Sequence, residues 1–264
     1  MQTRRLAMAG IAVLTSMSLS LTGCGPTGDD ASSTPGSNTT ASAPAKPKEP
    51  KEVLVEAAQK SAMESFHYTM TYSVLDMAGD FDPANKSALI KTKVNAGSQS
   101  MSYDTMLINQ DAWLKYYGVS SLPKKWLHIG TDALGADNKL WKTLDDPTGA
   151  SGYTNSAVDV QKVDDAHFKG TIDATKNPNG DGALQKSALE QMGDAAKAIP
   201  FEAELDDKGR LSKVTMDMPK VGAQPADTMQ ITFSDYGTSV SIKAPAAADT
   251  QEAPEAVLKG FKNL

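Results

Sequence analysis

Between residues 66 and 243 the sequence is a succession of segments in which large apolar side chains alternate with polar ones. In residues 66–74, for example, Phe66, Tyr68 and Met70 alternate with His67 and Thr69. A period of two predicts a strand with one apolar face. Further strands are expected at 87–94, 98–109, 110–117, 125–129, 166–173, 200–205, 210–218, 228–235 and 238–243. Short turns join many of them, including hairpins around 206–209 and 236–237.

Apolar residues with helical spacing predict helices at 52–63, 132–144, 184–198 and 255–261, whereas residues 153–159 favour neither type. Strands and helices do not alternate regularly, which argues against a doubly wound parallel sheet. The expected fold class is therefore α+β, with one large, curled antiparallel sheet of nine or ten strands and helices against one face.

The N-terminus carries an export signal that ends at the only cysteine of the chain. Arg4 and Arg5 precede an apolar run over residues 6–21, and Leu21-Thr22-Gly23-Cys24 reads as a lipobox. In bacterial lipoproteins this cysteine receives a diacylglycerol and becomes the N-terminus after cleavage. We expect residues 1–23 to be removed and Cys24 to anchor the chain to the outer face of the cell membrane.

Two alternatives to this interpretation are an ordinary signal peptide and an N-terminal membrane span. The apolar run is short for a span and rich in Ser, Thr and Gly. Arg4-Arg5 also resembles a twin-arginine signal, although the residues after it favour the general secretory route.

Residues 24–50 differ in composition from the rest of the chain. They are rich in Gly, Ser, Thr, Pro and Ala and contain almost no large apolar side chain. Such a segment cannot bury enough surface to offset its ordering entropy. We expect an acylated Cys24 followed by a flexible tether, and one folded domain over residues 51–264.

Charge and cysteine content exclude several functions. Without Arg4 and Arg5 the chain keeps 24 of its 26 basic residues against 32 acidic ones, a formal charge of −8. This charge repels phosphates, so nucleic acid is not an expected partner. With Cys24 acylated, disulfides, thiolate metal sites and cysteine nucleophiles are also excluded.

Several segments resemble the LppX/LprG-type lipoproteins of actinobacteria, which share the LolA/LolB-like fold. The resemblance lies in the order and spacing of five segments, and it covers roughly residues 51–250. The segments are 111–115 with 124–129, 160–163 with 167–173, 205–211, 231–237 and 242–245.

The resemblance implies a half-barrel sheet with helices at its open face and a cavity that holds acyl chains. The expected function is that of a carrier without covalent chemistry, whose partners are the acyl chains of a membrane lipid or lipoglycan, the membrane itself and an export transporter. A sensory or protein-interaction lipoprotein with a filled cavity is the alternative, and a hydrolase is a third.

Nine methionines remain after residue 23, several of them at strand positions where β-branched residues are more usual. Methionine is flexible and suits a cavity that accepts varied chains, but it also fills ordinary cores. The residues predicted to line the cavity alternate with polar neighbours on three strands. They are Phe66, Met70, Val74, Met216, Met218, Met229, Ile231 and Phe233.

Aromatic residues gather in one third of the domain. Trp113, Trp126, Trp141, Tyr116 and Tyr117 could either rim a cavity mouth or pack a sheet edge, and the sequence leaves both open.

No catalytic residue, metal ligand or cofactor is expected. His67, His128 and His167 lie in strand patterns and read as surface residues, and no metal-binding or nucleophile motif is present. Residues 177–182 resemble a calcium loop, but Ala188 occupies the twelfth position, where a calcium loop needs Glu.

Overall fold

The computed structural model describes residues 47–96, 99–176 and 186–262. The predicted signal peptide, Cys24 and most of the tether lie outside these residues. The strands are β1 Phe66–Tyr72, β2 Leu75–Asp82, β3 Ser87–Ala96, β4 Gln99–Ile108, β5 Asp111–Tyr117, β6 Trp126–Ile129, β7 Ala157–Lys162, β8 His167–Ile172, β9 Ile199–Leu205, β10 Leu211–Met218, β11 Asp227–Ser234 and β12 Thr250–Glu252. The α-helices are α1 Pro50–Ser61, α2 Thr131–Leu134, α3 Lys139–Asp145, α4 Ala150–Ser156, α5 Lys186–Met192 and α6 Glu255–Lys262.

All twelve strands belong to one open sheet in the order β12-β6-β5-β4-β3-β2-β1-β11-β10-β9-β8-β7. Every pairing is antiparallel except that of β12 with β6. The sheet is therefore large, mixed and unclosed, which agrees with the predicted α+β class. The half-barrel form remains a prediction.

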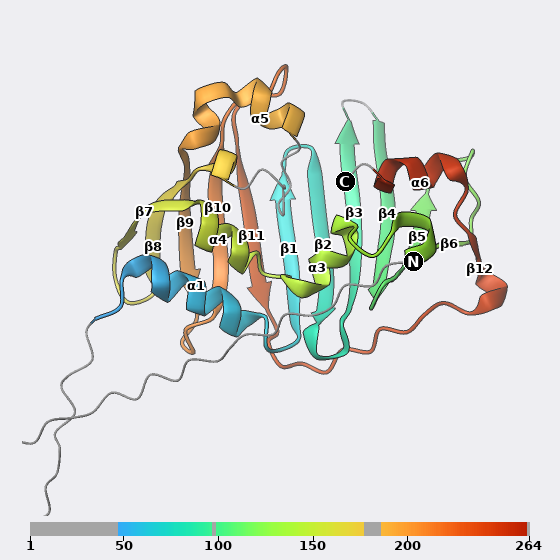
Figure 1. The fold of residues 1–264 in the computed structure, drawn as a ribbon, viewed down its shortest axis with the longest axis horizontal. Coiled ribbons are helices and arrows are strands. Elements are labelled where there is room, and N and C mark those ends of the chain that lie inside the picture. The colour runs from blue at the N-terminus through green and yellow to red at the C-terminus, as the bar shows by residue number, and fades with distance from the viewer. Residues whose placement is uncertain (1–46, 97–98, 177–185, 263–264) are drawn as a thin grey trace, which may run out of the picture. The chain divides into compact units, whose positions relative to one another are not determined.

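The helices lie on one face of this sheet, which we call the inner face (Figure 1). Leu54 of α1, Trp141 of α3 and Val257 of α6 are buried in the same core as Leu114 and Leu127 of the sheet. The opposite face, which we call the outer face, carries the alternate residues of each strand. Most of the buried apolar residues of the strands thus lie on the inner face.

The first strand was predicted too long, and the strand that follows it was missed. The expected strand 66–74 ends at Tyr72, and Ser73 and Val74 form a turn into β2. The sequence of β2, LDMAGDFD, contains three aspartates and a glycine, residues that are depleted in strands. It is nevertheless held in the sheet because β1 and β3 pair with it on both sides.

The last predicted hairpin is also wrong. Residues 238–243 form no strand, because β11 already pairs with β1 and β10 and has no free edge for them. The chain instead continues to β12, which the sequence did not indicate and which pairs in parallel with β6.

Two predicted helices are interrupted, and a third region is divided. Gly135, with a φ of 83°, separates α2 from α3, and the Asn138 side chain accepts a hydrogen bond from Leu140 N–H to begin α3. Gly193, with a φ of 59°, ends α5 before a 3-10 turn at Gly193–Lys197. The unassigned residues 153–159 comprise the end of α4 and the start of β7.

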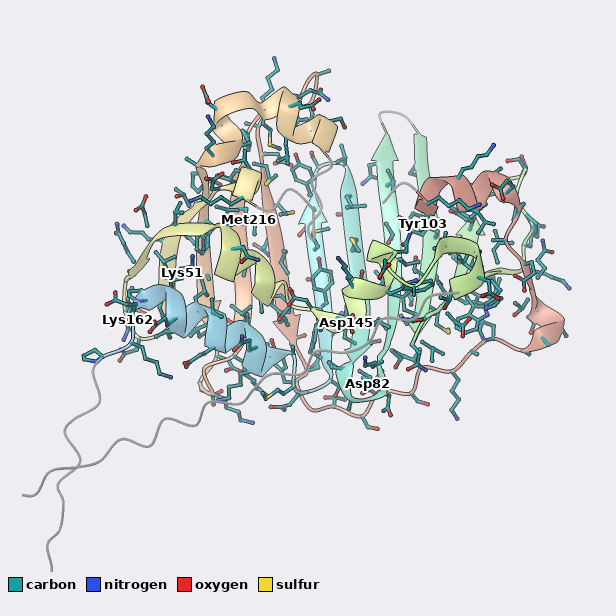
Figure 2. All side chains as sticks on the ribbon, viewed as in Figure 1. Lys51, Asp82, Tyr103, Asp145, Lys162 and Met216 are labelled. Atoms are coloured by element: carbon teal, nitrogen blue, oxygen red, sulfur yellow. The ribbon has the colours of Figure 1, made fainter. Side chains whose placement is uncertain are left out.

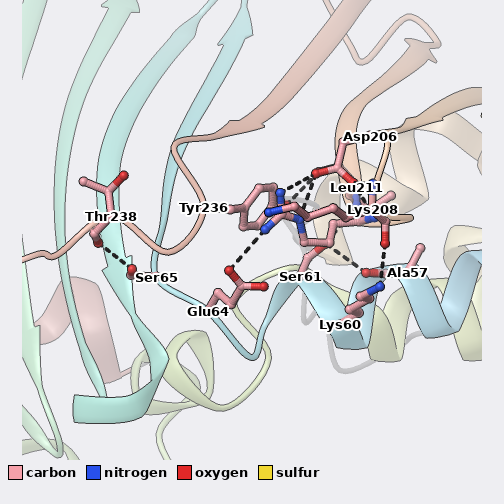
Figure 3. A network of polar contacts seen from close by, with 11 residues as sticks. Ala57, Lys60, Ser61, Glu64, Ser65, Asp206, Lys208, Leu211, Tyr236 and Thr238 are labelled. Carbon is pink, nitrogen blue, oxygen red and sulfur yellow. Dashed lines mark hydrogen bonds and ion pairs between the residues drawn. The ribbon is translucent and has the colours of Figure 1, made fainter.

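Helix α1 begins at Pro50, which occupies the first turn, where a missing N–H costs nothing. A polar network at its other end joins it to the β9–β10 hairpin and to the chain after β11 (Figure 3). Arg210 contacts Asp206 Oδ2 at 2.6 Å and Glu64 Oε2 at 3.1 Å, and its guanidinium lies 4.2 Å from the Tyr236 ring centroid.

Two hydroxyl groups complete this network. The Tyr236 hydroxyl donates to Leu211 O at 2.7 Å, and Ser61 Oγ accepts from Leu211 N–H at 2.8 Å. Because Arg210 and Ser61 are buried, this polar contact fixes where α1 crosses the sheet.

Candidate functional site

The inner face is apolar over a wider area than the helices cover. Cross-strand register places Met70, Met77, Thr92, Tyr103 and Tyr116 side by side across β1 to β5. Directly opposed residues of an antiparallel sheet point to the same face. One row of mostly apolar side chains therefore runs across the sheet.

A second row lies two residues further along the same strands and on the same face. Tyr72, Leu75, Val94 and Met101 are successive cross-strand partners in β1 to β4. Met101 is 36% exposed, and the other three are partly buried. In Figure 1 no helix lies in front of these strand ends, between α5 and α6.

We call the partly exposed members of these two rows the apolar strip. Its residues are Tyr72, Leu75, Met77, Val94, Met101, Tyr103 and Tyr116. Tyr103 and Tyr116 contact each other, with ring centroids 5.5 Å apart. Most of the strip could not be predicted from the sequence, because β2 lacks a clear strand pattern and the strip depends on its pairing with β1 and β3.

A second apolar group lies under α5 and is dominated by methionine. Its buried members, which we call the methionine cluster, are Met70, Met192, Ala196, Ile199, Met218 and Met229. Met77 and Met216 pack against it and are only partly buried. Methionine side chains adopt many conformations at low cost, so this wall can adjust its shape.

The eight predicted lining residues have different environments. Phe66 and Phe233 belong to the main core. Met70, Met218 and Met229 belong to the methionine cluster. Met216 and Ile231 border both. Figure 2 labels Met216 and Tyr103, one from each side of this face. Val74 differs from the others because it lies in the β1–β2 turn.

Two open pockets border the sheet, and Tyr72 of the apolar strip lines the first of them. One, of about 440 Å³, is lined mainly by polar residues at the ends of β1, β2 and β11. The other, of about 340 Å³, lies beside His67, Asp80 and the segment 238–242. Phe66 is the only predicted lining residue that borders either pocket.

The tryptophans do not form one rim. Trp141 is buried in the core, where its indole N–H donates to Gly135 O at 2.9 Å. Trp113 and Trp126 lie in β5 and β6 on the outer face, where Trp113 faces His128 with ring centroids 5.2 Å apart.

Each histidine pairs with a carboxylate on a partly exposed surface. His67 Nδ1 lies 2.8 Å from Asp80, and His167 Nδ1 lies 2.7 Å from Asp164. Among the described residues no serine hydroxyl is hydrogen-bonded to His67, and no group of three or more His, Cys, Asp or Glu residues could hold a metal ion. The loop 177–182 lies outside the part that the structure describes.

His128 of β6 contacts two carboxylates, one on β5 and one on β12. Its Nε2 lies 2.9 Å from Asp111, and its Nδ1 lies 3.0 Å from Glu252. Burial alone lowers the pKa of His128, but the hydrogen bonds and charges of Glu252 and Asp111 outweigh this effect and raise the pKa above its ordinary value.

We expect this pair of contacts to stabilise the fold most when His128 is protonated. A raised folded-state pKa gives a contribution that is complete below the ordinary histidine pKa of about 6.5 and is lost as pH rises through the folded-state value. The free energy of unfolding of the variant His128→Asn should therefore be lower than that of the parent protein at acidic pH, by less than about 1 kcal/mol. At about pH 8 the two free energies should be almost equal. Urea unfolding at both pH values measures this difference, and an equal loss at both would contradict the assignment.

No family model and no curated protein matches the chain. Among solved structures, a LolA superfamily protein from Nitrosomonas europaea is similar over 78% of this chain and 96% of that chain, with 8% sequence identity and a TM-score of 0.24. At these values the likeness does not establish a shared function. The fold and site themselves define an α+β protein with an open sheet, one face of which is apolar and is only partly covered by the residues that the structure describes.

No helix within the described residues is long and apolar enough to cross a membrane.

Proposed function

We propose that this protein is an LppX/LprG-type lipoprotein, anchored through Cys24 outside the cytoplasm, that carries acyl chains of a lipid or lipoglycan on its inner face. In this proposal the open sheet is the half-barrel of the LolA/LolB-like fold. The observation that supports it most is the apolar strip, because a folded protein rarely leaves a row of large apolar side chains partly exposed without a use for them.

Acyl chains fit the chemistry of this face. Burial of each methylene contributes about 0.8 kcal/mol, so a chain of about sixteen carbons gains on the order of 10 kcal/mol before the costs of binding. Met77 of the strip packs against the methionine cluster, as does Met216, and the flexible side chains of both can close around chains of different length. Binding by burial alone needs no covalent step, so we do not propose an enzyme.

The second candidate is a sensory or protein-interaction lipoprotein whose inner face is filled by its own side chains. It is favoured by the burial of five predicted lining residues, of which Phe66 is 1% and Met218 4% exposed. The part of the face around these residues is already packed. The two candidates therefore differ over the apolar strip, whose side chains border these cores but stay partly exposed.

A pair of exposed methionines tests the strip. Met101 lies on it, whereas Met63 is 77% exposed beyond the end of α1. We expect Met101→Asp to weaken binding of a fluorescent fatty acid at least about tenfold, because a carboxylate beside an acyl chain must be desolvated. Met63→Asp introduces the same charge away from the strip and should leave the affinity unchanged.

Both variants should remain folded, because each replaces a side chain that is already exposed. Equal affinities of the two variants for the fatty acid would contradict binding at the strip. Absence of binding by the parent protein would favour the second candidate.

A further inference from the structure

Methionine is concentrated in one part of the molecule. Six of the nine methionines that follow residue 23 either belong to the methionine cluster or pack against it. They come from five elements, namely β1, β2, α5, β10 and β11. We call these six residues the thioether group, and they are Met70, Met77, Met192, Met216, Met218 and Met229.

The main core of the same sheet is built from other residues. Within the described residues its buried members are Leu, Ile, Val, Ala, Phe and Trp, with no methionine among them. Both regions need apolar side chains that fill space, and β-branched or aromatic residues are the usual choice on strands. Space filling alone therefore does not explain why one region is made largely from methionine.

Strand register places four members of the thioether group next to one another. Met70 opposes Met77 across β1 and β2. Met216 opposes Met229 across β10 and β11. The Cβ atoms of directly opposed residues lie about 4.5–5.5 Å apart. Met70 also opposes Ile231, which lies two residues beyond Met229, so the two methionine pairs are diagonal neighbours on one face.

Helix α5 and the end of β10 supply the other two sulfur atoms. Met192, the last residue of α5, is 7% exposed, and Met218 of β10 is 4% exposed. Both are buried together with members of the two opposed pairs. These sulfur atoms are thus shielded from bulk water, whereas Met77 and Met216 are partly exposed and offer an entry path for an ion.

We propose that the thioether group is a binding site for Cu(I). Thioether sulfur is an uncharged, polarizable donor, and among biological metals Cu(I) is the ion that such soft donors favour. The methionine side chain is long and unbranched, so sulfur atoms from neighbouring strands can turn toward one ion.

The same donors disfavour other metals. The thioether group contains no carboxylate, imidazole or thiolate, which are the ligands that Ca²⁺ and Zn²⁺ prefer. Cu(II) prefers nitrogen and oxygen donors in a square-planar arrangement. The site should therefore select both the metal and its lower oxidation state.

Titrations with Ag(I) and Cu(I) test this site. The protein is residues 24–264 with Cys24→Ser and without an affinity tag, which contains every described residue and no thiol. Ag(I) has the charge and softness of Cu(I) and is titrated as silver nitrate in a calorimeter. Cu(I) affinity is measured in competition with bicinchoninate, without oxygen and with ascorbate. We expect one ion of either metal per chain and at least about tenfold weaker binding of Zn(II).

Leucine substitutions remove sulfur atoms while keeping most of the apolar volume. Met70→Leu/Met229→Leu takes one donor from each opposed pair and should weaken binding of both ions at least about tenfold, because a lost ligand costs no less than a lost outer-shell partner. Met63→Leu/Met106→Leu is the matched control. Met63 is 77% exposed and Met106 faces Trp113 on the outer face, so the affinity should not change.

Exchange of methionine for leucine is usually tolerated in cores, and thermal melts establish that each variant is folded. Met77→Leu/Met216→Leu changes partly buried residues and provides the same test if the first double variant is unstable. NMR of isotope-labelled methionine methyl groups adds a test without substitution. Addition of Ag(I) should shift the signals of the thioether group and leave that of Met63 in place.

Equal losses of affinity in the thioether and control variants would overturn the proposal, because the ion would then lie elsewhere. Absence of Ag(I) and Cu(I) binding by the parent protein would overturn it as well. The inference does not rest on the proposed acyl-chain carriage, which the fatty-acid titration measures separately. Metal binding without fatty-acid binding would support the copper site and contradict the carrier function.

Discussion

Replacing Arg210 by alanine should destabilise the domain by about 2–4 kcal/mol, the largest loss that we expect from any single polar side chain. The Arg210 side chain is 8% exposed, and its removal leaves Asp206 and Glu64 without their cation and the Tyr236 ring without its partner. Breaking a buried ion pair from one side costs more than the pair contributes, because the remaining charge stays desolvated. For a domain of this size the melting temperature should fall by roughly 5–15 °C.

Lys213→Ala is the matched control. Lys213 of β10 pairs with Glu204 of the neighbouring β9 at 3.2 Å, but the two side chains are 36% and 41% exposed. Its loss should cost less than about 1 kcal/mol. Urea unfolding of both variants measures the difference, and equal losses would show that the Arg210 network does not fix α1 on the sheet.

Replacing Met216 by tryptophan should reduce acyl-chain binding at least about tenfold while the stability of the domain is kept. Met216 is partly buried and borders both the main core and the methionine cluster. A larger side chain there occupies space that, in the proposed function, an acyl chain would fill. In the proposed function this space is not close-packed in the free protein, so the indole would meet little resistance.

Met229→Trp provides the comparison within the same cross-strand pair. Met229 faces Met216 across β10 and β11 but is only 9% exposed. Here the larger side chain should overpack the methionine cluster and cost about 1–3 kcal/mol. Thermal melts and a fatty-acid titration on both variants test this contrast. Destabilisation by Met216→Trp as well, without fatty-acid binding by the parent, would favour a filled inner face.

The sequence predicted most of the sheet, because its strands alternate cleanly between apolar and polar residues. The β9–β10 hairpin around residues 206–209 was predicted correctly, since both strands and their turn residues are local signals. Helix α6 was also predicted within one residue. These elements depend on short stretches of sequence, which is why local patterns suffice for them.

The elements that were missed depend on distant partners. β2 carries Asp76, Gly79 and Asp80 and becomes a strand because it fills the space between β1 and β3. At Gly79 a Cβ atom would lie 2.4 Å from Leu89 O, so the close approach of β3 requires glycine there. β12 has only three residues and follows from the path that the chain takes after β11.

The predicted lining residues were drawn from local patterns of the same kind. Seven of the eight lining residues lie on three strands, β1, β10 and β11, whose patterns were recognised, whereas Val74 lies in a turn. The apolar strip needs the register of β1 to β5, which no single segment contains.

The most direct test of acyl-chain carriage is mass spectrometry of an organic extract from purified residues 24–264 with Cys24→Ser, isolated from a bacterial host. Without the cysteine, any lipid that is recovered must be bound non-covalently. We predict lipid in near-stoichiometric amount from this protein and a clear reduction from the folded Met216→Trp variant. A lipid-free extract from protein that also fails to bind added fatty acid would contradict the account and leave the inner face as an ordinary core.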